Sequence, residues 1–261
     1  MYAMERHQLI ERLVVQDGRV AVVDLADRFG VTTETVRRDL DQLERAGALR
    51  RVHGGAVARE RTSLVEPSLV ERSSQRGAAK QAIAGRALDV LGDAFRGSVY
   101  IDAGTTTAAV ATLLPARLAE TDGSAEVVTH AMSVAGVLAG APRLSLTVIG
   151  GRVRGLTGAA VGSHTVRAIE GLRPDVAFIG TNGISAGFGL STPDPEEAAV
   201  KRAIVQSSRR VIVVSDAQKF DAELLVAFAG LDDIDVVVAD RAPGDTLGAA
   251  LHEAGTEVWT A

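Results

Sequence analysis

Seven short apolar runs rich in β-branched residues alternate with helix-like segments over the last two-thirds of the chain, and this alternation constrains the fold most. The runs are residues 98–101, 126–129, 144–149, 175–179, 210–214, 235–239 and 257–260. Strands that are apolar on both faces and separated by helices are typical of a mostly parallel sheet covered on both sides. We therefore predict an α/β fold. In such folds ligands bind at the carboxyl ends of the strands.

A second pattern occupies the first 60 residues and predicts three short amphipathic helices. Apolar residues recur at helical spacing within 9–13, 25–29 and 36–43. Thr32 or Thr33 can cap the third helix, because a side-chain oxygen there accepts a hydrogen bond from a backbone N–H that lacks a partner within the helix.

A predicted β-hairpin follows the helices, with strands at 48–51 and 56–59 joined through Gly54 and Gly55. Three helices and a hairpin in this order are typical of a winged helix-turn-helix, whose third helix reads DNA. The alternative is a solvated helix beside an ordinary hairpin, because ten acidic residues offset the ten arginines of the first 60 residues. On the DNA-reading interpretation, the contacts come from Thr33, Thr35, Arg37, Arg38, Arg50, Arg51 and His53.

Four predicted strand ends carry glycine-rich or polar segments. The segment 102–107, Asp-Ala-Gly-Thr-Thr-Thr, opens a helix, so its N–H groups and hydroxyls suit a phosphate, although such residues also cap helices that bind nothing. The segment 150–154 ends a second strand with two glycines and two arginines, which would either hold an anion or lie solvated. Residues 180–184 and 215–220 end two more strands. Their convergence at one edge of the sheet predicts a ligand pocket.

Lysine is rare in this chain, which has only Lys80, Lys201 and Lys219 among its 28 basic residues. Lys201 and Lys219 lie beside the predicted pocket. A compact ammonium suits a phosphate oxygen in a way that the planar guanidinium of arginine does not. The alternative is that all three are ordinary surface lysines.

Length and composition define the remaining expectations. We predict a DNA-binding domain at 1–58, a linker at 59–78 and a ligand-binding domain at 79–261. The absence of cysteine excludes disulfides and thiolate metal sites, and the five histidines lack ligand spacing, so no metal or cofactor is expected. No apolar run approaches the ~18 residues of a membrane span, and the first residues lack a signal-peptide pattern. We therefore expect a soluble, cytoplasmic protein.

The chain resembles the DeoR family of bacterial transcription regulators along almost its whole length. The matching segments are 24–26, 31–32, 35–40, 43–44, 47 and 51–56 in the first domain, and 102–106, 150–151, 154, 180–184, 197–203 and 216–220 in the second. The family's sensor domain is similar in fold to ribose-5-phosphate isomerases, glucosamine-6-phosphate deaminases and CoA transferases, and is thought to bind phosphorylated sugars. The resemblance implies ligand contacts from Asp102, Gly104, Thr105, Thr106, Thr107, Gly150, Gly151, Arg154, Asn182, Gly183, Glu197, Lys201 and Lys219.

Two segments depart from the family pattern, and both belong to the implied ligand loops. His130 and Ala131 stand where the family often has Asn-Ser, and Ala217 and Gln218 stand where it often has Ser-Ser. Of the properties that the resemblance implies, the identity of the sugar is therefore the one that is least safely carried over from the family to this chain. The run 189–198 looks most like regulators of fructose-uptake operons, which makes a fructose phosphate the first candidate.

The resemblance implies a repressor of a carbohydrate operon that binds double-stranded operator DNA as a homodimer or homotetramer and is relieved by a phosphorylated sugar. An isomerase or deaminase is the rival class, and it needs a carboxylate as general base. Residues 181–183, Thr-Asn-Gly, offer only an amide at the third strand end, although Asp102, Asp194, Glu196, Glu197 and Asp216 remain nearby. The appended DNA reader favours a sensor. The large pocketed domain disfavours an architectural DNA protein without an effector.

Overall fold

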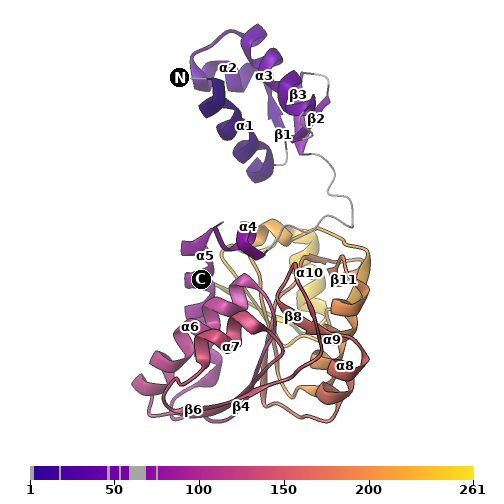
Figure 1. The fold of residues 1–261 in the computed structure, drawn as a ribbon. Helices are drawn as coiled ribbons and strands as arrows, with labels where there is room; N and C mark the ends of the chain where they lie inside the picture. Colours follow the sequence, from indigo (N-terminus) through magenta and orange to yellow (C-terminus); the bar gives the residue numbers. More distant parts are fainter. Residues whose placement is uncertain (1–2, 18, 46–47, 53, 59–68, 75) are drawn as a thin grey trace. The chain divides into compact units, whose positions relative to one another are not determined.

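The computed structural model describes residues 3–17, 19–45, 48–52, 54–58, 69–74 and 76–261 (Figure 1). The chain divides into two compact units after residue 62. The boundaries proposed from the sequence, at residues 58 and 78, stay a prediction. Within the predicted linker, the structure places helix α4 (Leu69–Ser74) and the start of α5 (Gly77–Ala87).

The first unit contains three helices and a three-stranded antiparallel sheet. Its elements are α1 (Ala3–Asp17), β1 (Arg19–Ala21), α2 (Val22–Phe29), α3 (Thr33–Arg45), β2 (Leu49–Val52) and β3 (Gly55–Ala58), with strand order β1-β3-β2. Ile10, Val36 and Leu40 are fully buried at the centre of its core. The three predicted helices and the hairpin are present, and β1 is a strand that the sequence did not predict.

The Gly54-Gly55 turn has a physical reason. Gly54 adopts φ of +81°, which favours glycine. A Cβ on Gly55 would lie 2.0 Å from the carbonyl oxygen of Val20, so only glycine lets β3 approach β1 this closely.

A seven-stranded parallel sheet forms the centre of the second unit, in the order β15-β14-β12-β9-β4-β5-β6. All seven predicted runs are strands of this sheet, so the prediction of an α/β fold with a parallel sheet is confirmed. Their bounds are β4 (Arg96–Ile101), β5 (Ser124–Thr129), β6 (Leu144–Val148), β9 (Val176–Ile179), β12 (Val211–Val214), β14 (Val236–Ala239) and β15 (Glu257–Thr260).

Two apolar cores lie on opposite faces of this sheet. Within β4, Val99 and Ile101 belong to one core and Tyr100 to the other, as the alternation of a strand requires. Figure 1 shows α6 and α7 on one side and α8, α9 and α10 on the other. The helix bounds are α6 (Thr105–Glu120), α7 (Met132–Leu138), α8 (Ser163–Glu170), α9 (Pro195–Ser207) and α10 (Asp245–Glu253), with short 3₁₀ helices η1 (Leu88–Leu91) and η2 (Ala217–Lys219).

Five short strands outside the parallel sheet were not predicted. β7 (Arg152–Arg154) and β8 (Ala159–Val161) form a hairpin, and β10 (Gly183–Ser185), β11 (Gly189–Thr192) and β13 (Val226–Ala229) form a small antiparallel sheet. β7 and β10 begin inside glycine-rich segments that end two of the parallel strands. Among the described residues, none of the helices is both long and apolar enough to cross a membrane.

Candidate functional site

The start of α3 presents exposed arginines. Thr32 caps this helix, because its Oγ1 accepts the backbone N–H of Thr35 at 3.2 Å. The side chains of Arg37 and Arg38 are 54% and 79% exposed, and each lies within 4 Å of exposed Glu34. Ion pairs this exposed contribute at most about 1 kcal/mol to stability. Both guanidinium groups can therefore leave Glu34 and bind another anion at little cost in free energy.

A buried ion pair fixes α3 on α1. Arg6 donates to both oxygens of Asp39, at 2.7 and 3.0 Å, and His7 Nε2 lies 2.9 Å from Oδ1. Burial opposes ionisation of Asp39, but the hydrogen bonds from Arg6 and His7 outweigh it and lower the pKa of this carboxyl. Sequence reasoning missed the pair, although Asp39 lies three residues after Val36 on the apolar side of the helix.

Of the three basic residues predicted on the hairpin, Arg51 is the one whose side chain the structure describes. Arg51 forms an ion pair with Asp41, and its backbone N–H donates to Glu44 at 2.8 Å, so it braces β2 against α3. Its role in DNA binding stays a prediction. His53 and the side chain of Arg50 lie outside the described residues.

In the second unit, a buried ion pair joins three predicted site segments at the carboxyl edge of the sheet. Asp102 follows β4 and is fully buried. Its Oδ2 pairs with Lys201 of α9 and accepts the Gly180 N–H at 3.0 Å. Lys201 Nζ also donates to the Gly180 carbonyl at 2.9 Å. These contacts hold the ends of β4 and β9 against the first half of α9.

The second carboxylate oxygen of Asp102 is left open. Oδ1 is one of the few buried side-chain atoms that lack a hydrogen-bond partner among the described residues. An unsatisfied buried acceptor costs about 1–3 kcal/mol. His130 Nε2 lies 3.7 Å from this oxygen, too far for a hydrogen bond. A donor brought by a ligand would satisfy this oxygen.

His130 follows β5 and belongs to the same buried group. Its Nδ1 lies 3.0 Å from the Tyr100 hydroxyl. Burial lowers the pKa of His130 to about 4, so the ring is neutral at neutral pH. When the hydroxyl of Tyr100 donates to Nδ1, the ring proton is on Nε2 and faces Asp102. The sequence marked His130 only as a departure from the family pattern, and it gave no sign of Tyr100.

Arg154 and Glu197 are brought together, but they bind each other and their neighbours. Arg154 Nη1 lies 3.2 Å from Glu197 Oε1, and its Nε lies 3.1 Å from Asp194 Oδ2. Thr157 donates to Glu197 Oε1 at 2.5 Å. Asp194 also caps α9 by accepting the N–H groups of its residues 196 and 197. The group therefore joins the β7–β8 hairpin to the start of α9.

The predicted glycines and threonines lie at close contacts along the same edge. Gly104 precedes α6, and its carbonyl accepts the Thr107 hydroxyl at 3.0 Å. A Cβ on Gly151 would lie 2.1 Å from Thr165 Oγ1, so α8 packs directly on this glycine. Thr105 and Thr106 are the first residues of α6, and Gly183 is the first residue of β10. The backbone carbonyl of Gly150 accepts the Thr165 hydroxyl at 3.0 Å. The side-chain oxygen of Asn182 accepts the Thr192 hydroxyl at 3.2 Å.

Lys219, at the end of η2, is the second predicted lysine of the pocket. Its Nζ lies 3.9 Å from Asp216, whose Oδ1 lies 3.7 Å from Arg76. Burial lowers the pKa of Lys219 to about 8, against the effect of Asp216. Lys80 and Lys201 are buried, and Lys219 is partly buried. The alternative of three surface lysines is therefore wrong.

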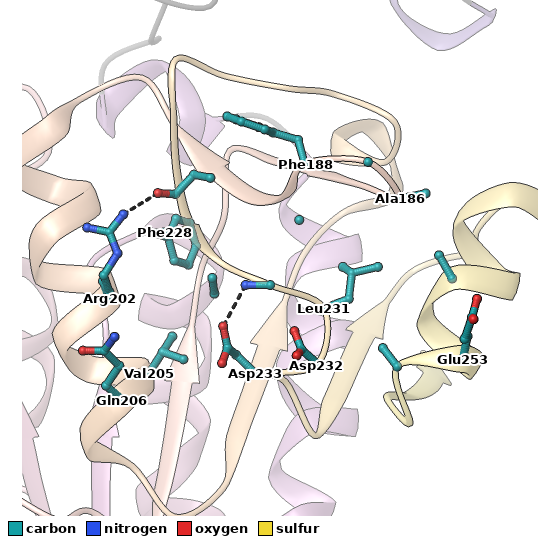
Figure 2. Close-up of a pocket in the computed structure, with 17 residues that line it drawn as sticks. Ala186, Phe188, Arg202, Val205, Gln206, Phe228, Leu231, Asp232, Asp233 and Glu253 are labelled. Atoms are coloured by element: carbon teal, nitrogen blue, oxygen red, sulfur yellow. Dashed lines mark hydrogen bonds between the residues drawn. The ribbon is translucent and has the colours of Figure 1, made fainter.

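A separate hollow of about 730 Å³ lies near the far end of α9 (Figure 2). Phe188 stands over it, Arg202 and Gln206 line it from α9, and Glu253 lines it from α10. Both helix ends lie toward the amino edge of the sheet, away from Asp102. None of the predicted ligand residues is among the described residues that line this hollow.

Among the described residues, no group of three or more His, Asp and Glu side chains is arranged to hold a metal ion.

Comparison with known proteins covers both units. Residues 6–62 match the DeoR-like helix-turn-helix domain, and residues 75–241 match the DeoR C-terminal sensor domain. The chain is 34% identical to a Bacillus subtilis protein named uncharacterized HTH-type transcriptional regulator FruR, over 92% of each chain. It is 34% identical to the HTH-type transcriptional regulator GlpR of Haloferax volcanii, over 91% of this chain and 89% of that one.

Two further proteins represent a named repressor and a solved structure. The glycerol-3-phosphate regulon repressor of Escherichia coli is 30% identical, over 93% of each chain. Ribose 5-phosphate isomerase A from Methanocaldococcus jannaschii superposes with a TM-score of 0.42 at 13% identity, over 56% of this chain and 55% of that one. The sequence relatives are named as regulators and repressors, in agreement with the prediction of a regulator and not an enzyme. The chain belongs to the DeoR family of DNA-binding transcriptional regulators.

Proposed function

We propose that this protein represses a carbohydrate operon and leaves its operator when a phosphorylated sugar fills the pocket at the carboxyl edge of the sheet. The observation that carries the ligand part is the open Oδ1 of buried Asp102, which directly precedes the segment that begins α6. The name of the glycerol-3-phosphate regulon repressor supports the repressor part. Such a regulator acts on the chromosome, and hence in the bacterial cytoplasm.

The pocket suits a ligand with a hydroxyl end and an anionic end. A hydroxyl group can donate to Asp102 Oδ1 while it accepts from His130 Nε2, which bridges the 3.7 Å between them. The phosphate must lie elsewhere, because two anions repel each other. Backbone N–H groups of Thr105 and Thr106 at the start of α6, together with Lys219, suit it.

Fructose 1-phosphate is the first ligand to test, because one relative is named FruR and the run 189–198 resembles fructose-operon regulators. Glycerol 3-phosphate is the second, because another relative is named for that regulon. Both compounds carry a hydroxyl group and a phosphate monoester.

On the DNA side, Thr33, Thr35, Arg37 and Arg38 would enter the major groove from the start of α3. Arg50, Arg51 and His53 would follow the backbone or the minor groove. A symmetric operator requires two copies of this unit, so a homodimer or homotetramer is the expected assembly.

Operator binding by the full-length chain, titrated with fructose 1-phosphate, glycerol 3-phosphate and fructose at fixed salt, tests the proposal. Release by one phosphorylated ligand and not by fructose would support it. Operator affinity that stays constant at saturation with each compound would refute it. Conversion of either phosphate compound, followed by NMR, would favour the isomerase or deaminase alternative.

A further inference from the structure

Three cations from different segments lie near one another, and the sequence had placed only Lys219 among the ligand contacts. They are Arg72 of α4, Lys80 of α5 and Lys219 of η2. Lys80 Nζ donates to the backbone carbonyl of Arg72, which places the ammonium under α4. Lys80 is 7% exposed, and the side chain of Lys219 is 21% exposed.

Positive charge dominates around these side chains. Burial lowers the pKa of Lys219, and the charges of Arg72, Lys201 and Lys80 lower it further, whereas Asp216 is the one carboxylate that acts to raise it. Burial likewise lowers the pKa of Lys80, against the effect of Asp216. Asp216 is also within 4 Å of Arg76. Crowded, partly desolvated cations of this kind favour a dianion among them.

Helix α4 forms one wall of this cluster. The backbone N–H of Leu69 donates to Leu156 in the β7–β8 turn at 3.1 Å, and the helix packs on α6. Lys80 supports its second half through the Arg72 carbonyl. α4 is therefore held at its first residue by the β7–β8 turn and in its second half by Lys80 of α5.

We propose that Arg72, Lys80 and Lys219 form the subsite for the dianion of a phosphate monoester, and that an occupied subsite holds α4 against α5 and η2. The inference rests on the proposed function and adds the residues that read the phosphate. α4 is the first described element of the sensor unit after the DNA-binding unit in the chain. A phosphate that fixes α4 acts on the part of the sensor nearest in sequence to the DNA reader.

Hydrogen exchange of the full-length protein tests the subsite with inorganic phosphate as the probe. We expect phosphate, compared with chloride at equal ionic strength, to slow amide exchange in residues 69–74. The effect should be lost in Lys219→Gln and kept in Arg96→Gln, whose side chain is 63% exposed at the amino edge of the sheet. Unchanged exchange in residues 69–74 of the wild type at saturating phosphate would overturn the proposal.

Affinity for fructose 1-phosphate provides a second readout. Removal of one charged hydrogen-bond donor should weaken binding roughly tenfold or more in Arg72→Gln, while Arg72→Lys retains part of it. Equal affinities in wild type and Arg72→Gln would contradict the inference. If Arg72→Gln does not fold, as judged by thermal melting, Arg72→Lys and Lys219→Gln decide.

The two proposals can fail separately. Slowed exchange in α4 without operator release would leave the subsite in place and refute the inducer role. Operator release by fructose 1-phosphate that is identical in wild type, Arg72→Gln and Lys219→Gln would leave the inducer role and refute the subsite.

Discussion

Arg37 and Arg38 differ from Arg51 in what a DNA phosphate or base would have to displace. The first two pair only with exposed Glu34 among the described residues, whereas Arg51 is engaged by Asp41. We expect Arg37→Ala or Arg38→Ala to weaken specific operator binding by roughly 1–3 kcal/mol without loss of thermal stability. Gel-shift titration at fixed salt measures this. Wild-type affinity in both variants would show that α3 is not the reader.

His130 makes the stability of the sensor unit depend on pH. The pKa of His130 is about 4 in the folded state and about 6.5 in the unfolded chain. Between pH 6.5 and pH 4, therefore, the unfolded chain takes up a proton on this ring and the folded protein does not. The contribution of His130 is complete above about pH 6.5 and is lost as the pH falls toward 4, at roughly 1.4 kcal/mol per pH unit.

Urea unfolding between pH 4 and pH 7 should therefore show a shallower pH dependence in His130→Asn than in wild type. Asp39 does not confuse the comparison, because its pKa is lowered and its contribution is lost only in more acidic solution. Parallel curves of unfolding free energy against pH in the two proteins would show that burial does not lower the pKa of His130.

At the scale of elements, the Asp102–Lys201 pair binds α9 to the end of β4. Lys201→Met would leave a buried carboxylate without its cation, which should cost about 3–5 kcal/mol of unfolding free energy. Adding Asp102→Asn removes that charge and should recover much of the loss. Denaturant titration of both single variants and the double variant measures the coupling. Additive losses would mean that the two groups do not interact.

The central parallel strands β9, β12 and β14 could be predicted because they are buried on both faces, and such a strand is an apolar run visible in local sequence. β11 and β13 could not, because each has four residues and they pair across more than 30 positions of chain. Side-chain pairing was equally hidden. The sequence pointed to Asp102 and Lys201 separately, but their contact, like that of Arg6 with Asp39, exists only after distant elements pack.

At the scale of the whole molecule, the inducer model requires reciprocity. If fructose 1-phosphate weakens operator binding, the operator must weaken fructose 1-phosphate binding by the same factor. The corresponding coupling free energy is usually about 1–3 kcal/mol. Lys219→Ala should keep the operator affinity measured without ligand and lose release by the sugar phosphate. Arg38→Ala should show the reverse. Calorimetry of sugar-phosphate binding with and without operator measures the factor, and a sugar-phosphate affinity that the operator leaves unchanged would exclude the model.

The unequal exposure of the three lysines makes amine chemistry selective in this protein, because Lys80 and Lys201 are buried and Lys219 is partly exposed. Lys80, Lys201 and Lys219 are the only side-chain amines. Because burial lowers the pKa of Lys219 to about 8, a large fraction of this amine is neutral near pH 8. A mild acylating reagent should therefore modify Lys219 before the other two. A bound phosphate ester should slow that modification. Peptide mapping by mass spectrometry, which distinguishes an adduct on Lys219 from one on the α-amino group, would then report occupancy of the proposed site without any label added by mutation.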